Sequence, residues 1–471
     1  MKIYNFILLT LLSCSQISFA QSAKQKIANA FQNFENQQNL KNGIAAFTVL
    51  DNKTGQVVYD KNGHIGLPTA STMKVITAIT ALDLLGPDFT FQTKLYYTGV
   101  IDSLGTLQGN IIIQGGGDPT LASDRFEKNS EATLLQSWLL AIQSAGIKHV
   151  QGKIIGDDRY LNGYDVPGTW MWQDMGNYYG AGVSGLNWRE NKTGLIFSAT
   201  GVNQPTRLTK TTTDISYLNV VNEVKTGASG SGDNVYGYAA PYSHTIYLRG
   251  TYGADLKKTI EISIPDPAFD AAYHLQQQLI SNGIPVDLQA TTGKLLANNN
   301  EPFPTENIEL HVHHSPKLAE IIYWFNQKSI NLYGEALLKV IGERSPIMSN
   351  RNNPTQLVEK YWQQKLGIGP GELTLKDGSG LSPQNRVTTS AMTKIMRYAK
   401  QRNWYEVFEK SLATPNNIKM KSGTIGGVLG YTGYHTSVAN DDYVFALLIN
   451  NYRGNASSMR QAMFKVLDTL K

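Results

Sequence analysis

Hydrophobic and polar positions near the two ends of the chain follow a mixture of strand and helix spacings. Residues 44–50 read as a strand, 51–55 as a turn and 56–59 as its partner strand. Apolar residues then recur at helical spacing from Thr69 until Gly86 and a proline end the segment. Further helices and strands are expected at residues 317–325, 332–341, 418–423, 443–450 and 458–470.

The middle of the chain has a different pattern, with short apolar runs separated by glycine, asparagine and aspartate, as in strands joined by turns. We therefore predict an α/β, multi-domain fold. Both ends of the chain, residues 21–92 and 306–471, would form one domain of sheet plus helices. Residues 93–305 would be a large β-rich insertion that forms one or two extra domains. The two-domain alternative groups 93–118 with 199–305 and sets 119–198 apart.

The composition narrows the class of protein. At 471 residues the chain is too long for one ordinary hydrophobic core, which supports several domains. Its 43 glycines and 17 prolines fall well below the roughly 25–30% that marks low-complexity chains, so a folded protein is expected. The 42 basic residues barely exceed the 37 acidic ones and form no stripe, so no nucleic-acid partner is expected.

Residues 1–20 predict export as a signal peptide. A short basic start precedes an apolar run, and small residues at Ser18 and Ala20 suit cleavage before Gln21. In the alternative, the only cysteine, Cys14, ends a lipobox and carries a lipid anchor. No later apolar run reaches the ~18 residues that a membrane helix needs, so no transmembrane segment is expected.

The segment from Ser71 to Lys74 is the only Ser-x-x-Lys in the chain. At helical spacing the Lys74 amine can reach the Ser71 hydroxyl. A serine becomes a nucleophile when an adjacent base takes its proton, and the start of a helix favours developing negative charge. Taken alone, the motif also describes an ordinary pair on a helix surface.

A second motif, Ser329-Ile330-Asn331, lies between two helical patterns. A serine presented there can relay a proton to a leaving amine, and an asparagine can hold a substrate carbonyl. In the alternative, Ser329 or Asn331 only caps the helix that follows.

A third motif of the form Lys-Ser/Thr-Gly is expected on a strand. Literal Lys-Thr-Gly triplets start at Lys53, Lys192 and Lys225, but all precede the second motif, and we interpret them as coincidental. The segment from Lys421 to Thr424 fits better, because it follows both other motifs and opens an apparent β-hairpin. An extended peptide could lie along such a strand with its carboxylate beside Lys421.

The three motifs, in this order, resemble those of the penicillin-recognising serine hydrolases. Further segments are similar to one branch, the class C low-molecular-mass penicillin-binding proteins, which are D-Ala-D-Ala carboxypeptidases and endopeptidases of peptidoglycan. These segments are residues 117–121, 170–175, 328–339 and 377–382. The long spacing between Lys74 and Ser329 is also typical of that branch, whose insertion forms extra domains.

The resemblance implies a β-lactamase/transpeptidase-like catalytic domain in a periplasmic serine-type D-Ala-D-Ala carboxypeptidase, with endopeptidase activity on cross-links. Ser71 would be the acylated nucleophile and Lys74 its base. Ser329 and Asn331 would form the second motif, and Lys421 would hold the substrate's terminal carboxylate.

The resemblance also implies an oxyanion hole made by the backbone N–H groups of Ser71 and Thr424. The hydroxyls of Ser422 and Thr424 would assist Lys421. Expected partners are peptidoglycan stem peptides and cross-links, together with β-lactam antibiotics, while the oligomeric state stays open.

A pocket for the substrate's diaminopimelate side chain is implied in the insertion. The carboxylate of Asp174 would bind the side-chain ammonium, and Tyr179 would line its methylenes. Where this family usually places an arginine for the side-chain carboxylate, the chain has Pro383, and Arg386 lies three residues further on. Partial recognition of that side chain is therefore expected.

No metal and no cofactor are expected. His311 and His313 share a strand face beside His314, but no third ligand follows at a useful spacing, so a polar strand end is favoured over a metal site. One alternative function is a serine β-lactamase, although residues 183–187 lack the acid that class A enzymes use for deacylation. Another is a non-catalytic wall-binding protein, against which the intact motifs argue.

Overall fold

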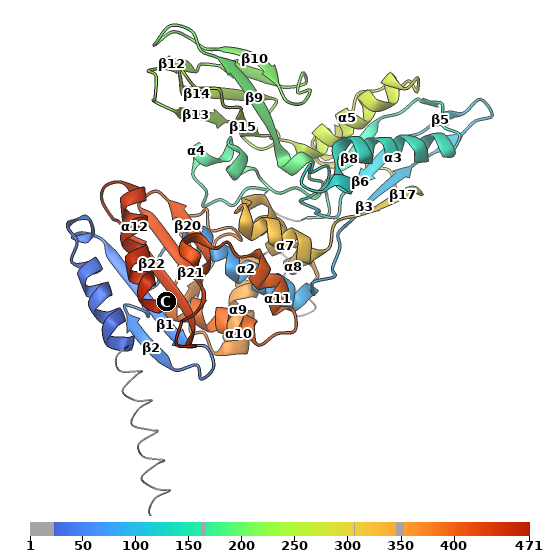
Figure 1. Ribbon diagram of the computed structural model, residues 1–471. Coiled ribbons are helices and arrows are strands. Elements are labelled where there is room, and N and C mark those ends of the chain that lie inside the picture. Colours follow the sequence, from blue (N-terminus) through green and yellow to red (C-terminus); the bar gives the residue numbers. More distant parts are fainter. Residues whose placement is uncertain (1–22, 162–164, 306, 345–352) are drawn as a thin grey trace, which may run out of the picture. The chain divides into compact units, whose positions relative to one another are not determined.

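The computed structural model describes residues 23–161, 165–305, 307–344 and 353–471 (Figure 1). The predicted signal peptide, its cleavage before Gln21 and the alternative anchor at Cys14 lie outside the described residues. The chain divides into two compact units. Unit 1 comprises Met1–Asp83, Ile322–Ser329 and Thr355–Lys471, and unit 2 comprises Leu84–Ile321 and Ile330–Pro354.

Unit 1 is built on a five-stranded antiparallel sheet whose strands come from both ends of the chain. In spatial order the strands are β2 (Val57–Lys61), β1 (Ile44–Asp51), β22 (Asp442–Asn450), β21 (Val428–Thr436) and β20 (Lys419–Ile425). The central strands β1 and β22 read as nearly continuous apolar runs because both of their faces are covered. The other edge of β20 makes one isolated bridge, between Met420 and Ala413, and no other strand among the described residues pairs there. The part of that edge after Met420 can therefore accept a further strand.

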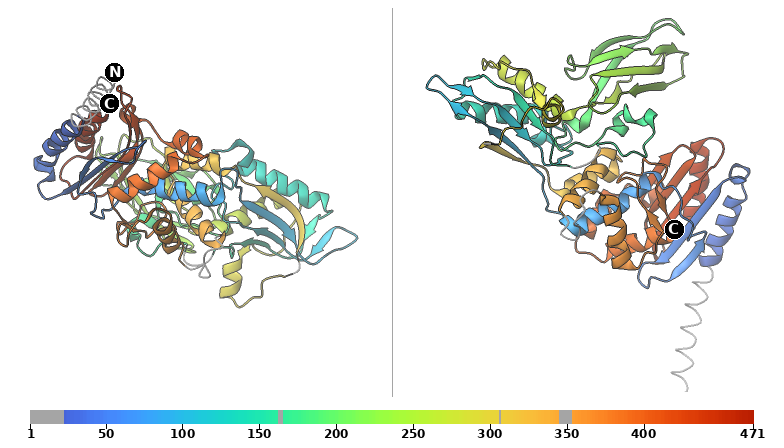
Figure 2. Two further views of the ribbon diagram at one scale, coloured as in Figure 1. Left: turned by 90° about the horizontal axis from the view of Figure 1, so that it is seen from below. Right: turned by 180° about the vertical axis from the view of Figure 1, so that it is seen from behind.

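Helices cover both faces of this sheet (Figures 1 and 2). On one face, the helix over residues 23–35 and α12 (Ala456–Leu467) bury Phe31 and Met463 against β1 and β22. On the other face α10 (Thr389–Lys400) packs on β1, where the hydroxyls of Thr48 and Thr389 are 2.7 Å apart in a hydrogen bond. Unit 1 therefore has three layers, helix, sheet and helix.

The predicted helix after Thr69 is confirmed, and it starts as a 3-10 turn. This turn, η2 (Ala70–Met73), continues as α2 (Lys74–Leu85), and Gly86 at φ +81° ends it. The strands and helices expected toward the C-terminus are also confirmed. The remaining helices and strands between residues 318 and 411 are α7 (Leu318–Gln327), α8 (Asn331–Arg344), α9 (Pro354–Leu366), β18 (Leu373–Thr374), β19 (Arg386–Val387) and α11 (Tyr405–Ser411).

Unit 2 contains several sheets. Its largest runs in the order β16 (Thr291–Thr292), β8 (Ile154–Asp157), β6 (Ile111–Gln114), β3 (Gln92–Tyr97) and β17 (Ile308–His314). A second sheet has β10 (Arg207–Thr211), β9 (Lys192–Ser198) and β15 (Ile260–Ser263). A third has β11 (Asn219–Asn222), β14 (Thr245–Gly253) and β12 (Lys225–Gly227), with β13 (Asp233–Tyr238) also on β14. The smallest has β4 (Val100–Ile101), β5 (Thr106–Gln108) and β7 (His149–Val150).

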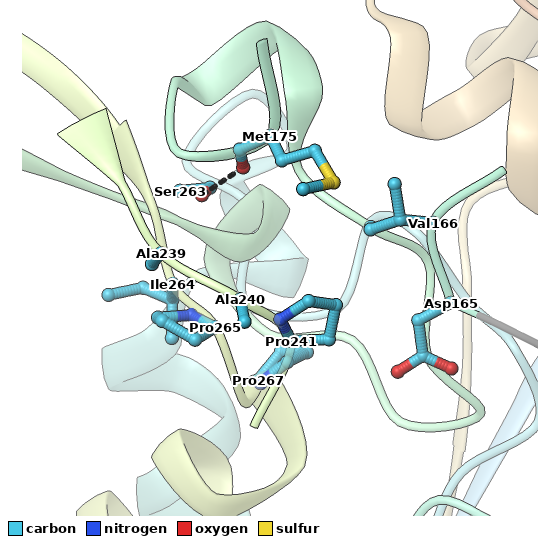
Figure 3. A pocket seen from close by; sticks show the side chains of 11 residues that line it. Asp165, Val166, Met175, Ala239, Ala240, Pro241, Ser263, Ile264, Pro265 and Pro267 are labelled. Carbon is cyan, nitrogen blue, oxygen red and sulfur yellow. Dashed lines mark hydrogen bonds between the residues drawn. The ribbon is translucent and has the colours of Figure 1, made fainter. Parts of the chain in front are cut away.

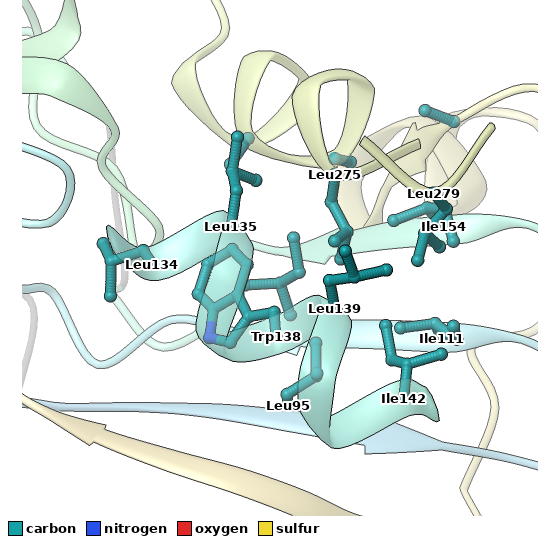
Figure 4. Packing of buried hydrophobic residues seen from close by; sticks show 14 of the residues in the cluster. Leu95, Ile111, Leu134, Leu135, Trp138, Leu139, Ile142, Ile154, Leu275 and Leu279 are labelled. Carbon is teal, nitrogen blue, oxygen red and sulfur yellow. The ribbon is translucent and has the colours of Figure 1, made fainter. Parts of the chain in front are cut away.

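Unit 2 also holds two long helices that the β-rich interpretation of the sequence missed. These are α3 (Glu131–Ser144) and α5 (Pro267–Ser281), and two shorter helices are α4 (Trp172–Met175) and α6 (Gly293–Asn298). Trp138 of α3 is fully buried among apolar side chains of the large sheet and of α5 (Figure 4). Each large apolar side chain buried in this way contributes roughly 1.5–3 kcal/mol.

The strand pairing does not follow the two-domain alternative for the insertion. β6, within residues 93–118, pairs with β8, within residues 119–198, so these segments share one sheet. β17, beyond residue 305, pairs with β3 in the same sheet. The outer boundaries of the insertion at 93 and 305 stay a prediction. No helix in the described ranges is both long and apolar enough to cross a bilayer.

Candidate active site

Ser71 and Lys74 lie together at the junction of η2 and α2. Lys74 Nζ donates a hydrogen bond to Ser71 Oγ at 3.0 Å and a second to the backbone carbonyl of Ser379 at 2.7 Å. The lysine side chain is fully buried, and its Nζ lies 5.9 Å from the centre of the Phe325 ring. The three-residue spacing of the motif thus brings amine and hydroxyl into hydrogen-bond contact.

The backbone before Ser71 is strained. Ala70 has φ +46°, in the left-handed region that an alanine rarely adopts. Such conformations cluster at functional sites, where the surrounding structure holds them. Here the loop between β18 and β19 supplies part of that support, because a Cβ at Gly380 would come within 1.9 Å of the Ala70 carbonyl oxygen.

The loop of residues 377–385 is organised by Asp377. Its carboxylate accepts hydrogen bonds from the backbone N–H of Gly380 at 2.7 Å and of Ser382 at 2.5 Å, and from Asn385 Nδ2 at 2.8 Å. Asp377 and Asn385 are both buried. Because Ser379 lies in this loop, the Asp377 hydrogen bonds fix the carbonyl that Lys74 contacts. The sequence marked the segment as family-like but assigned Asp377 no role.

Lys421 of β20 contacts Ser329 in the same unit. Its Nζ donates to Ser329 Oγ at 3.0 Å and to the carbonyl of Ser422 at 3.0 Å. The lysine is 4% exposed, and burial lowers its pKa from 10.5 to about 8. Ser329 has φ +56°, a second strained residue beside the reactive groups.

β20 runs directly beside the turn that carries Ser71. A Cβ at Gly423 would lie 2.7 Å from the Thr69 carbonyl oxygen and 2.9 Å from the Ser71 backbone nitrogen, so only glycine permits this approach. Ser422 and Thr424 alternate with Gly423 and are exposed. The Thr424 hydroxyl also accepts a hydrogen bond from Arg460 at 3.3 Å.

The three literal Lys-Thr-Gly triplets lie elsewhere. Lys53 belongs to the turn between β1 and β2, and its Nζ donates to a loop carbonyl at Asn440. Lys192 opens β9, and Lys225 opens β12, both in unit 2. The triplet that begins at Lys421 thus differs from these three, because its lysine contacts Ser329 of the second motif.

The remaining predicted site residues belong to unit 2. Asn331 is the first residue of α8, and its Nδ2 donates to the backbone carbonyl of Tyr179 at 2.7 Å. The hydroxyl of Tyr179 donates to Asp174 Oδ1 at 3.3 Å. Burial is the main cause that raises the pKa of the Asp174 carboxyl and of the Tyr179 hydroxyl. The three residues predicted in unit 2 therefore form one connected group.

The arginine near Pro383 and the histidines of β17 lie in the described part of the chain. Arg386 donates to the backbone carbonyls of Pro383 at 2.7 Å and of Asn385 at 2.8 Å. His311 and His313 lie on β17, and burial lowers the pKa of His313 to about 4. Among the described residues no group of three or more His, Cys, Asp or Glu side chains could hold a metal ion.

Comparisons with known proteins place this geometry in context. The model of the D-Ala-D-Ala carboxypeptidase 3 (S13) family matches residues 25–470. A D-alanyl-D-alanine carboxypeptidase from Actinomadura sp. (strain R39) is 25% identical over 446 residues, which cover 88% of this chain and 79% of that protein.

Solved structures agree at the level of the fold. The crystal structure of penicillin-binding protein 4 (DacB) from Haemophilus influenzae superposes with a TM-score of 0.75 at 21% identity, covering 93% of this chain and 97% of that one. The same protein complexed with a β-lactam gives a TM-score of 0.71 at 20% identity and the same coverage.

Proposed function

This chain belongs to the D-Ala-D-Ala carboxypeptidase 3 (S13) family, and from that premise we propose that Ser71 carries its catalysis. The protein is a serine-type D-Ala-D-Ala carboxypeptidase. In the proposed reaction Ser71 Oγ attacks the carbonyl carbon of the penultimate D-Ala, the terminal D-Ala leaves, and water hydrolyses the acyl-enzyme. The observation that carries the assignment is the 3.0 Å hydrogen bond between Lys74 Nζ and Ser71 Oγ.

Lys74 is the proposed base for this attack. A lysine can take a proton only in its neutral form, which a buried, water-poor site favours over the charged form. The hydrogen bond to the Ser379 carbonyl holds Lys74 Nζ in place, and the nitrogen lone pair can then face the Ser71 hydroxyl. After proton transfer the resulting ammonium keeps the carbonyl as a hydrogen-bond acceptor.

Ser329 and Lys421 are proposed to act at the leaving side of the substrate. The contact between Lys421 Nζ and Ser329 Oγ supports a role for the serine in passing a proton to the departing amine. The ammonium of Lys421 would pair with the terminal carboxylate of a peptide laid along the open edge of β20. Asn331, two residues after Ser329, is proposed to hold a substrate carbonyl.

The backbone N–H groups of Ser71 and Thr424 are the proposed oxyanion hole. The close approach at Gly423 supports this role, because it keeps β20 beside the Ser71 backbone. Two N–H donors fixed before the reaction stabilise the tetrahedral oxygen without having to reorganise. The exposed hydroxyls of Ser422 and Thr424 remain proposed partners of the carboxylate.

The same acyl-enzyme gives two further proposed activities. A peptidoglycan cross-link is also an amide of a D-Ala carbonyl, so a stem-peptide amine can leave in place of D-Ala, which is endopeptidase activity. A β-lactam carbonyl would acylate Ser71 in the same way, as the β-lactam complex of the Haemophilus influenzae protein suggests by its fold.

We also propose that the protein is exported to the periplasm, where peptidoglycan is accessible. Cleavage before Gln21 is the preferred route, and lipid attachment at Cys14 is the alternative. Mass spectrometry of the mature N-terminus distinguishes them. A chain that starts at Gln21 eliminates the anchor.

Release of D-alanine from a peptide ending in D-Ala-D-Ala tests the proposed function. The wild-type protein should release it, and Ser71→Ala should not, with an unchanged circular dichroism spectrum. Release by Ser71→Ala at the wild-type rate would show that another group is the nucleophile.

A further inference from the structure

Unit 2 contains a cavity that the proposed reaction does not use. Its volume is about 610 Å³, within the ~300–1,000 Å³ typical of small-molecule sites. It lies beside a smaller hollow (Figure 3), and Asp165, Val166, Met175 and Pro241 line both. Trp172 and Met175 of α4 line it, whereas Asp174 of the same helix and Tyr179 do not, so its lining differs from that of the proposed pocket for the substrate side chain.

Aromatic rings form much of its wall. Trp170, Trp172 and Tyr242 all line the cavity, together with prolines of the same two loops. Trp172 is 55% exposed, whereas Trp170 is 7% exposed. The Trp172 ring packs beside Tyr238, with the ring centres 6.2 Å apart, and its remaining exposed surface gives the cavity an apolar patch.

The polar part of the cavity is an ion pair. Lys294 Nζ lies 2.9 Å from Asp165 Oδ1, and the hydroxyl of Tyr242 hydrogen-bonds to the other oxygen of Asp165. Lys294 Nζ also lies 3.7 Å from Asp158 Oδ2, so two carboxylates share the ammonium. This leaves no unpaired positive charge for an anionic ligand, and the ammonium itself disfavours a cationic one. Both groups are already hydrogen-bonded, but the Lys294 side chain is 28% exposed and a carboxylate oxygen can accept a further hydrogen bond, so a neutral polar ligand can join this network.

Tyr242 adopts an unusual backbone conformation at this place. Its φ of +63° lies in the left-handed region, which is rare for a bulky aromatic residue. Its ring lies beside Lys294, whose Nζ is 4.4 Å from the ring centre. Backbone strain of this kind is typical of ligand-binding positions.

We propose that this cavity binds a neutral amino-sugar ring, an N-acetylated hexosamine of the glycan strand that carries the stem peptides. One face of a pyranose ring presents C–H groups that pack on an indole, and its edge presents hydroxyls for Asp165 and Lys294. A charged ligand would leave one member of that ion pair unfavourably placed. The inference rests on the proposed function, because it takes the glycan from the proposed substrate.

Titration with a β-1,4-linked N-acetylglucosamine trimer, followed by tryptophan fluorescence and calorimetry, tests the sugar site on the full mature chain. The wild-type protein should bind the trimer saturably. Trp172→Ala should weaken the affinity at least tenfold, and Trp172→Phe should restore part of it. Tyr247→Ala, which removes an exposed aromatic ring elsewhere in unit 2, is the matched control and should bind like the wild type.

A kinetic comparison separates this inference from the proposed function. The ratio of kcat/KM for a disaccharide-bearing peptide to that for the same peptide without sugar should fall at least fivefold in Trp172→Ala. It should stay constant in Tyr247→Ala. Absence of saturable trimer binding, or an unchanged ratio, in a preparation that still releases D-alanine overturns the sugar site alone. A wild-type protein that releases no D-alanine would instead overturn the proposed function.

Discussion

Lys74 and Lys421 are two buried lysines of unit 1 that contact different serines. Lys421 donates hydrogen bonds to the Ser329 hydroxyl and to the Ser422 carbonyl, which are neutral oxygens. Burial lowers the pKa of Lys421, and no carboxylate of the described residues offsets this effect. A substrate carboxylate would supply that missing negative charge. Removal of Lys421 should therefore weaken substrate binding.

Replacing Lys421 by alanine should lower kcat/KM for D-Ala-D-Ala hydrolysis at least about tenfold, or ~1.4 kcal/mol of transition-state binding. The rate of penicillin acylation should fall similarly, because β-lactams carry a carboxylate in the same place. Lys225→Ala and Lys53→Ala, which alter two of the literal Lys-Thr-Gly triplets, are the controls. A loss in either control as large as that in Lys421→Ala would mean that the wrong triplet was chosen.

The pKa of Lys421 also predicts a pH dependence. Since burial lowers this pKa to about 8, the ammonium disappears as the pH rises through 8, and kcat/KM should decline there. The linked effect on stability has the opposite sign: between pH 8 and 10.5 the unfolded chain binds more protons than the folded one, so folding stability rises with pH. A kcat/KM profile that stays flat from pH 7 to pH 9.5 would contradict the role of Lys421.

Individual site residues differ in how far the sequence could predict them. Ser71 and Lys74 are three positions apart, so local helical spacing alone brings them together. Lys421 and Ser329 are far apart in the chain, and only the order of the motifs indicated that they meet. Asp377 could not be assigned, because its effect depends on a loop that returns to Lys74 from the other end of the chain.

The loop of residues 377–385 is the element that fixes the environment of Lys74. Its conformation depends on one carboxylate that gathers two backbone N–H groups and the amide of Asn385. Gly380 at φ +83° lets the loop reach Ala70 without a side chain in the way. A change in the loop should therefore reach Ser71 through Lys74, without touching substrate.

Asp377→Ala should lower kcat at least about tenfold and lower the melting temperature, because three buried donors lose their acceptor. Gln384→Ala, an exposed position on the same loop, should change neither. Asp377 acts as a positioning residue, so the acylation rate by penicillin should drop together with kcat. A variant that is destabilised but acylates at the wild-type rate would contradict that role.

The segment around α4 is the element on which recognition of the substrate side chain depends. Asp174→Asn should lower kcat/KM at least about tenfold on peptides with a free side-chain ammonium, or ~1.4 kcal/mol. It should hardly affect peptides whose side-chain amine is acylated, because they carry no charge for Asp174. Equal losses on both substrates would indicate that Asp174 only supports Tyr179 through their hydrogen bond.

The helices α3 and α5 were not predicted from the sequence, although both carry helix signals. Both begin with a side-chain cap, Ser130 for α3 and Asp266 before Pro267 for α5. Their apolar positions follow helical spacing as well. These signals were present in the sequence, but the frequent glycine and asparagine around them favoured a strand interpretation of the whole middle region.

At the scale of the whole molecule, the α/β multi-domain class was predictable, whereas the arrangement of sheets in unit 2 was not. Alternating patterns at both ends of the chain identify the elements of unit 1, whose sheet joins β1 to β22. The large sheet of unit 2 gathers β3, β6, β8, β16 and β17 from segments far apart in sequence. Pairing over such distances depends on packing that local periodicity does not encode.

Peptide mapping by mass spectrometry after brief exposure to benzylpenicillin tests the assignment of Ser71 most directly. The account predicts one covalent adduct, which maps to Ser71, persists after excess drug is removed and is absent from Ser71→Ala. A fast loss of the adduct with continued penicillin turnover would instead describe a β-lactamase. An adduct on any other residue, or undiminished labelling of Ser71→Ala, would contradict the central claim.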